Sequence, residues 1–131
     1  MQRKSLLFAV ILMFLSVSAQ NKVEKWCIYE IVLKGVTKSN PFTEVQLSAK
    51  FTNGENAKTV TGFYDGNGIY KIRFMLQELG IWTYITSSNL KSLQNKKGKF
   101  ECVSNTSKNH GPVVVKDTFN FAYADNKSYY P

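Results

Sequence analysis

The sequence predicts an all-β protein, an antiparallel β-sandwich of about seven to eight strands. The segment 62–74 reads as strand, tight turn and strand, because Asp-Gly-Asn-Gly at 65–68 supplies residues that tolerate positive φ. The segment 44–52 alternates apolar and polar side chains with a period of two. No stretch after residue 19 carries a sustained helical period. A small closed barrel is the alternative fold.

Residues 1–19 are predicted to be a cleavable signal peptide. Arg3 and Lys4 precede an apolar run at 6–17, and small residues follow where a signal peptidase cuts. The run is shorter than the roughly 18 residues that span a bilayer, which disfavours a membrane anchor. We expect a secreted, periplasmic or cell-surface protein with no membrane span after cleavage. The sandwich is expected at 20–104, and a linker with the start of a following domain at 105–131.

The strands of the sandwich are expected at regular spacing, with turn residues between them. They are predicted at 26–34, 44–52, 58–65, 69–76, 80–86 and 98–103, and further short elements at 113–115 and 119–124. Pro41 marks a turn at 40–42, and 77–79 has the composition of one helical turn. Within 44–52 the residues predicted to share one face are Val45, Leu47, Ala49 and Phe51.

The formal net charge of +8 does not predict a nucleic-acid partner. The lysines are scattered, apart from Lys96, Lys97 and Lys99 in a glycine-containing turn, and Arg73 is the one arginine after residue 19. A nucleic-acid protein concentrates positive charge on one face and uses arginines to read bases. We therefore interpret the lysines as surface charge for solubility and as protection of sheet edges.

Two cysteines, Cys27 and Cys102, are a candidate disulfide in an exported chain. A bridge would tie the first strand to a late one and close a long loop. The alternative is a pair of buried, unpaired thiols, since the sequence does not show whether the two Cα atoms are close enough.

The sequence shows no arrangement of residues that predicts catalysis, a metal or a cofactor. His110 has no evident partner, no serine stands in a nucleophile elbow, and no cluster has the spacing of metal ligands. The Asp-Gly-Asn-Gly turn lacks the later acidic ligands of a calcium loop. A glycosidase needs two carboxyl groups that flank the scissile bond. The acidic residues lie on different predicted elements: Glu30, Glu44, Asp65, Glu78, Glu101 and Asp117.

Aromatic side chains are the remaining candidates for a binding site. Trp26 and Trp82 are predicted to lie in the core, because sandwiches bury large rings on their strands. Tyr64 and Tyr70 flank the predicted hairpin and are the candidates for stacking on a sugar.

Several segments, taken in order, resemble a known domain. They are Glu24-Lys25-Trp26, Asn40-Pro41-Phe42, 62–75, Gly80-Ile81-Trp82-Thr83-Tyr84, Asn109-His110-Gly111-Pro112 and 121–131. This order resembles the immunoglobulin-like domain of unknown function that precedes the catalytic (β/α)8 barrel of bacterial proteins regarded as glycoside hydrolases, some called apiosidase-like or collagen-binding. The resemblance spans essentially all of the chain after residue 19, and its most specific parts are the hairpin and the Gly-x-Trp-x-Tyr strand.

The resemblance implies an exported, non-catalytic accessory module that packs against the catalytic barrel of the same polypeptide. The catalytic carboxylates would belong to the barrel, and this chain would end as the barrel begins. Cys27 stands where relatives often carry a polar or small residue, which favours unpaired thiols, and Leu76 stands where proline is common. The alternative functions are an independent carbohydrate-binding module, with a polysaccharide as partner, and, less favoured, an adhesion or matrix-binding domain.

Overall fold

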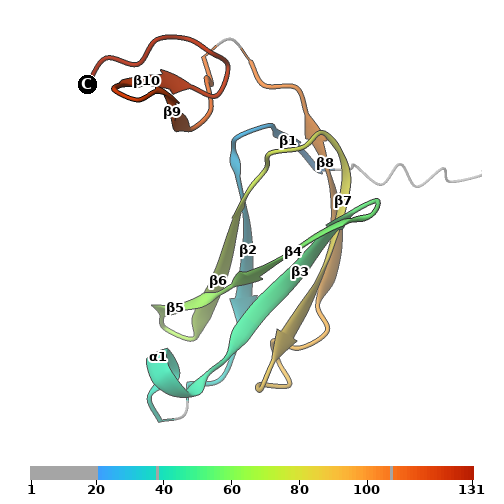
Figure 1. Cartoon of the computed structure of the whole chain (residues 1–131). Helices are drawn as coiled ribbons and strands as arrows, with labels where there is room; N and C mark the ends of the chain where they lie inside the picture. Colours follow the sequence, from blue (N-terminus) through green and yellow to red (C-terminus); the bar gives the residue numbers. More distant parts are fainter. Residues whose placement is uncertain (1–20, 38, 107) are drawn as a thin grey trace, which may run out of the picture.

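The computed structural model describes residues 21–37, 39–106 and 108–131, so the predicted signal peptide lies outside the described residues. Strands dominate the chain, which confirms the all-β prediction (Figure 1). The elements are β1 (Asn21–Glu24), β2 (Ile28–Lys34), α1 (Pro41–Glu44), β3 (Leu47–Asn53), β4 (Asn56–Thr61), β5 (Phe63–Gly66), β6 (Ile69–Met75), β7 (Gly80–Ser88), β8 (Lys97–Val103), β9 (Val113–Asp117) and β10 (Asn120–Tyr123).

Two sheets form the sandwich, and a third forms a separate hairpin. The first sheet has the order β1-β8-β7-β3-β4, the second has the order β2-β6-β5, and β9 pairs with β10. The pairs are antiparallel except for β1, which runs parallel to β8. The predicted β-sandwich is therefore confirmed.

The strand predicted at 58–65 is in fact two strands that belong to different sheets. It breaks at Gly62, whose N–H donates to the Leu47 carbonyl at 2.8 Å, so β4 ends in one sheet and β5 begins in the other. The predicted first strand at 26–34 begins only at Ile28, and β1 lies before it. Side-chain periodicity predicted neither the division of 58–65 into two strands nor the later start of β2, since both depend on how the strands are distributed between the two sheets.

Two short connections also differ from the prediction. The turn expected at 40–42 opens the helix α1, because the Asn40 side chain accepts a hydrogen bond from the Phe42 N–H at 3.2 Å and Pro41 occupies the first turn. No helix forms at 77–79, where the chain only bends.

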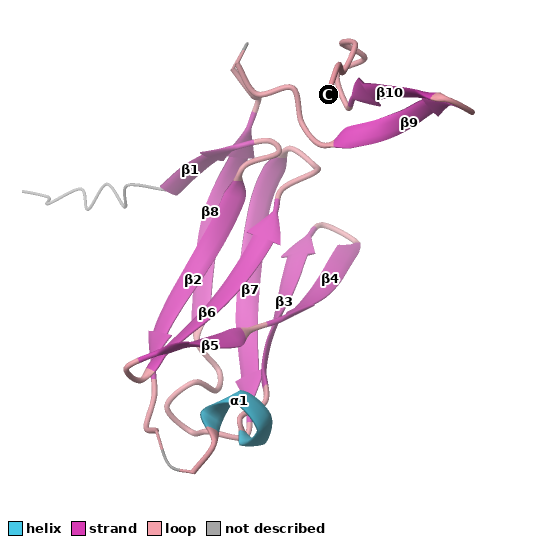
Figure 2. Cartoon of the chain, turned by 90° about the vertical axis from the view of Figure 1, so that its left-hand side faces the viewer, coloured by secondary structure: helices cyan, strands magenta, loops and turns pink. Residues whose placement is uncertain are grey.

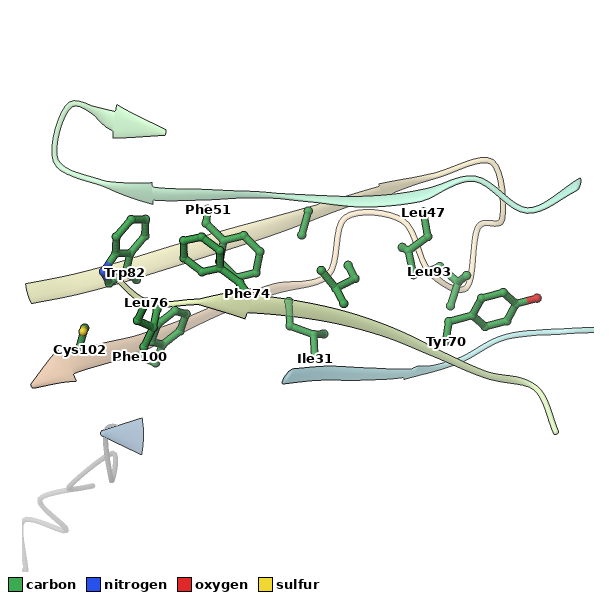
Figure 3. Close-up of a cluster of buried hydrophobic side chains, with 12 residues drawn as sticks. Ile31, Leu47, Phe51, Tyr70, Phe74, Leu76, Trp82, Leu93, Phe100 and Cys102 are labelled. Atoms are coloured by element: carbon green, nitrogen blue, oxygen red, sulfur yellow. The ribbon is translucent and has the colours of Figure 1, made fainter. Parts of the chain in front are cut away.

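The core lies between the two sheets and is rich in aromatic rings (Figure 3). Leu47, Ala49 and Phe51 are buried as predicted, whereas Val45 precedes β3 and is half-buried. The Phe51 ring stacks on Phe74, with centroids 4.4 Å apart. The other buried members of this cluster are Ile31, Tyr70, Ile72, Leu76, Trp82, Leu93, Phe100 and Cys102.

The β9–β10 hairpin lies beyond one end of the sandwich, and α1 lies at the other end (Figures 1 and 2). Among the residues that the structure describes, no helix is long and apolar enough to cross a membrane.

Candidate interaction site at the C-terminal hairpin

Tyr64 and Tyr70, the predicted sugar-stacking residues, do not form an exposed platform. Tyr70 is 1 % exposed, its hydroxyl donates to the Val36 carbonyl at 3.4 Å, and burial raises the pKa of its phenol. Tyr64 is half-buried, and its ring is tilted by 54° to that of Tyr70. The prediction is corrected for Tyr70, because a ring in the core cannot meet a ligand. Tyr64 and Tyr70 lie on the paired strands β5 and β6, and the packing of the five-stranded sheet against this pair decides which of the two rings is covered.

Trp82 is 1 % exposed and lies in the core as predicted, but Trp26 does not. Trp26 is half-buried in the turn between β1 and β2, and Lys25 Nζ lies 4.9 Å from the centre of its ring. Its φ of 68° is in the left-handed region, which is strained for a bulky residue. The backbone N–H of Trp26 donates a hydrogen bond to the Leu76 carbonyl at 2.6 Å, which holds the residue in this conformation. The turn thus presents the ring to the segment that follows β8.

We use the name joint for the contact of residues 24–27, the end of β1 and the turn after it, with residues 106 and 108–111. The Glu24 carboxylate accepts hydrogen bonds from the Thr106 N–H at 3.2 Å and from its hydroxyl at 3.1 Å. The Asn109 amide donates to the Lys25 carbonyl at 3.2 Å. Gly111 lies against the Trp26 ring so closely that an added Cβ would be 2.6 Å from Cδ2. The joint therefore fixes the start of the hairpin to the sandwich.

His110, for which the sequence suggested no partner, pairs with Asp125. Its Nδ1 lies 2.7 Å from the Asp125 carboxylate, and the other carboxylate oxygen accepts a hydrogen bond from the Lys127 N–H at 3.1 Å. Partial burial by itself raises the pKa of Asp125, but the Lys127 N–H and His110 outweigh it and hold that pKa below its usual range. His110 precedes β9 and Asp125 follows β10, so the pair links the two ends of the hairpin.

The hairpin and the tail that follows it, residues 113–131, expose several large apolar side chains. Phe119 is 90 % exposed, Tyr130 is 86 % exposed and Val115 is 67 % exposed. Beside them lies a groove of about 520 Å³, which we name the hairpin groove. Its lining residues are Lys116, Asp117, Phe119, Asn120, Phe121, Ser128, Tyr129, Tyr130 and Pro131. Clustered exposed apolar side chains typically mark an interaction surface. Sequence reasoning missed this surface, because a strand pattern does not show whether a second layer covers the strand.

Residues 22–89 match the protein family described as Domain of unknown function (DUF5060). The chain belongs to the DUF5060 family. It is also similar to a solved structure described as a "putative glycoside hydrolase" from Bacteroides vulgatus, with 47 % sequence identity and a TM-score of 0.79. That match covers 86 % of this chain but 22 % of the other chain. No curated protein matches the chain.

This DUF5060 chain brings two carboxylates together, but on an open surface. Asp65 lies 2.6 Å from Lys71 Nζ, and Glu30 lies 3.8 Å from the same atom and 2.6 Å from Arg73. Both carboxylates are thus engaged by cations on the outer face of the three-stranded sheet. Within the described ranges, no group of three or more histidine, cysteine or acidic residues could hold a metal ion.

The two cysteines of the DUF5060 chain are free thiols in the structure. Cys102 is buried in the core, and burial raises the pKa of its thiol. Cys27 is half-buried at the joint, where its sulfur accepts a hydrogen bond from the Asn109 amide at 3.3 Å. A disulfide between them in an oxidising compartment stays a prediction.

Proposed function

We propose that this chain is a non-catalytic accessory module of a glycoside hydrolase and that it packs against the catalytic part of that enzyme. The observation that carries the proposal is the asymmetric match: the similarity covers 86 % of this chain and 22 % of the hydrolase-like chain. At 47 % identity the two chains share more than a common fold. The larger remainder of the relative is then the natural place for the catalytic groups.

The arrangement of carboxylates supports a non-catalytic role. Glycoside hydrolysis generally uses one carboxyl group as the acid and a second as base or nucleophile on opposite sides of a bound sugar. Here Glu30 and Asp65 share Lys71, and none of the three described grooves is lined by either carboxylate. We propose that hydrolysis is performed by a (β/α)8 barrel in the parent polypeptide.

The hairpin supplies a surface for that contact. A two-stranded hairpin is at best marginally stable alone in water, and this one exposes Phe119 and Tyr130 almost fully. Covering a large apolar side chain stabilises a complex by about 1.5–3 kcal/mol. We propose that the hairpin groove and these rings face the catalytic part, while the joint keeps the hairpin attached to the sandwich.

We also propose that the module acts outside the cytoplasm, because residues 1–19 have the pattern of a signal peptide. N-terminal sequencing of the protein recovered from cells tests this, with Gln20 expected as the first residue. An N-terminus at Met1 in the exported fraction would contradict it.

The accessory role is tested with the Bacteroides vulgatus relative, from which the matched 22 % is removed. We expect the remainder to bind this chain in solution and to recover stability or activity, and this chain alone to hydrolyse no glycoside. The double substitution Phe119→Ser and Tyr130→Ser should weaken binding about tenfold or more, since about 1.4 kcal/mol corresponds to a factor of ten.

Phe42→Ser is the matched control, because Phe42 is 72 % exposed on α1 at the opposite end of the sandwich. It should leave binding unchanged. Glycosidase activity in this chain alone, or equal loss of binding in the control, would overturn the proposal.

A further inference from the structure

The cationic side chains on the outer faces of the two sheets differ in whether they form ion pairs with carboxylates. On the three-stranded sheet, Lys71 and Arg73 point outward from β6, and each lies 2.6 Å from a carboxylate. Those carboxylates are Asp65 on β5 and Glu30 on β2, the strands on either side of β6. Lys71 and Arg73 are therefore neutralised by their neighbours, whereas Lys34 at the end of β2 has no ion pair among the described residues.

The outer face of the five-stranded sheet carries Lys22 on the edge strand β1 and, on the inner strands, three exposed lysines without such partners. They are Lys50 on β3 and Lys97 and Lys99 on β8. None of the three forms an ion pair with a carboxylate in the part of the chain that the structure describes. Glu101 follows Lys99 on this face of β8. In the strand register it stands opposite Lys22 of the neighbouring strand β1 and not opposite any of the three lysines.

The strand register places these lysines on both sides of the same short stretch of β7. Ile85 of β7 is paired with Lys50 on one side and with Lys97 on the other, and Thr83 is paired with Lys99. Because neighbouring strands lie about 4.8 Å apart, the Cα atoms of Lys50 and Lys97 are roughly 10 Å apart. The register thus brings three positive side chains around Ile85 and Thr83, with no acidic residue directly opposite any of them in β7.

Of the two interpretations made from the sequence, solubility and protection of sheet edges, the second does not apply to these three lysines. The order β1-β8-β7-β3-β4 places β3, β7 and β8 inside the sheet, with β1 and β4 at its edges. The lysines instead border a hollow of about 520 Å³ in the sheet face. Its lining residues are Lys50, Thr52, Thr83, Tyr84, Ile85, Lys97, Gly98 and Lys99.

We propose that this hollow, the lysine hollow, binds a polysaccharide that carries carboxylate groups, a polyuronate. The proposal rests on the accessory function above, which makes a glycan the expected class of ligand. The three ammonium groups would pair with carboxylates, the threonine hydroxyls would bond sugar hydroxyls, and Ile85 would meet the apolar face of a ring. Because threonine and isoleucine lie between the charges, the site fits a chain with one carboxylate per sugar better than a chain with several sulfates per sugar.

The test measures binding of the purified chain to polygalacturonate by isothermal titration calorimetry at low salt. The controls are methyl-esterified polygalacturonate, which keeps the backbone but loses the charge, and dextran sulfate. We expect binding to polygalacturonate that weakens as salt is added, and little binding to the esterified polymer.

Variants locate the site. The triple substitution of Lys50, Lys97 and Lys99 by Gln should lower affinity for polygalacturonate by about tenfold or more, since each exposed ion pair contributes up to about 1 kcal/mol. The matched control replaces Lys34, Lys91 and Lys108 by Gln, which removes the same charge from exposed positions outside the hollow. Thermal unfolding checks that both variants fold.

Equal loss of affinity in both triple variants would show attraction to net charge alone and would overturn the proposal. So would the absence of polygalacturonate binding, or a preference for dextran sulfate. This assay uses the chain alone, so its failure is distinguishable from failure of the accessory role, which is measured with the remainder of the hydrolase.

Discussion

The sandwich and the hairpin use the same kinds of residue for opposite purposes. In the sandwich, Phe51 is 0 % exposed and packs against Phe74, Tyr84 and Phe100. In the hairpin, Phe119 is 90 % exposed, and Ala122 is the one residue of β9 and β10 that is buried. The sandwich completes its own core, whereas the hairpin presents apolar surface that its own residues leave uncovered. The proposed contact with the catalytic part would cover that surface.

The largest expected effect is on the free energy of unfolding, and it tests the comparison with one phenylalanine from each region. Phe51→Ala should lower the free energy of unfolding by about 3–5 kcal/mol, because it removes a large ring and leaves a cavity. Phe119→Ala should change it by less than about 0.5 kcal/mol, because the ring is already in water. Urea denaturation followed by circular dichroism measures both. A large cost for Phe119→Ala would show that this ring is covered in solution.

The next effect concerns the joint. Gly111→Ala introduces left-handed strain of about 1–2 kcal/mol and also presses a Cβ onto Trp26. Gly54→Ala is the matched control, because Gly54 also has a positive φ but an added Cβ there would meet nothing within 4 Å. The Ala124 N–H, which donates to the Pro112 carbonyl, should exchange faster in Gly111→Ala than in Gly54→Ala. Equal exchange in the two variants would mean that the Trp26 contact does not hold the hairpin.

The smallest effect is a dependence of the hairpin on pH. Because the pKa of Asp125 is lowered in the folded chain, its carboxylate stabilises the hairpin above the ordinary carboxyl pKa of about 3.9. This contribution is lost as the pH falls through the lowered pKa. The amide chemical shift of Lys127, whose N–H donates to the Asp125 carboxylate, should therefore change in acid in the natural chain. Asp125→Asn should abolish that change, and persistence of the change would assign it to another group.

Local sequence patterns predicted the sandwich well where apolar and polar residues alternate along a strand, because the alternation distinguishes its buried face from its exposed face. The alternation at 44–52 identified Leu47, Ala49 and Phe51 as core residues, and the Asp-Gly-Asn-Gly turn placed β5 and β6 as a hairpin. Trp82 is also buried as predicted, on the ground that sandwiches bury large rings on their strands. These predictions succeed because side-chain period and turn chemistry act over a few residues.

The candidate site was much less accessible to sequence reasoning. The His110–Asp125 pair joins residues 15 apart, and the joint brings Glu24 to Thr106, 82 residues away. Trp26 was assigned to the core on its size alone, although its backbone conformation turns it toward Gly111. Contacts at such separations depend on how the sheets and the hairpin are placed in space.

The sequence by itself determined the β class, the strand faces and the turns, because these follow from the conformational preferences of neighbouring residues. The tertiary structure alone decided which tyrosine is buried, which lysines share one hollow, and which apolar rings are left in water. Those features depend on the order of strands in each sheet and on which layer covers which, and neighbouring residues do not encode that order.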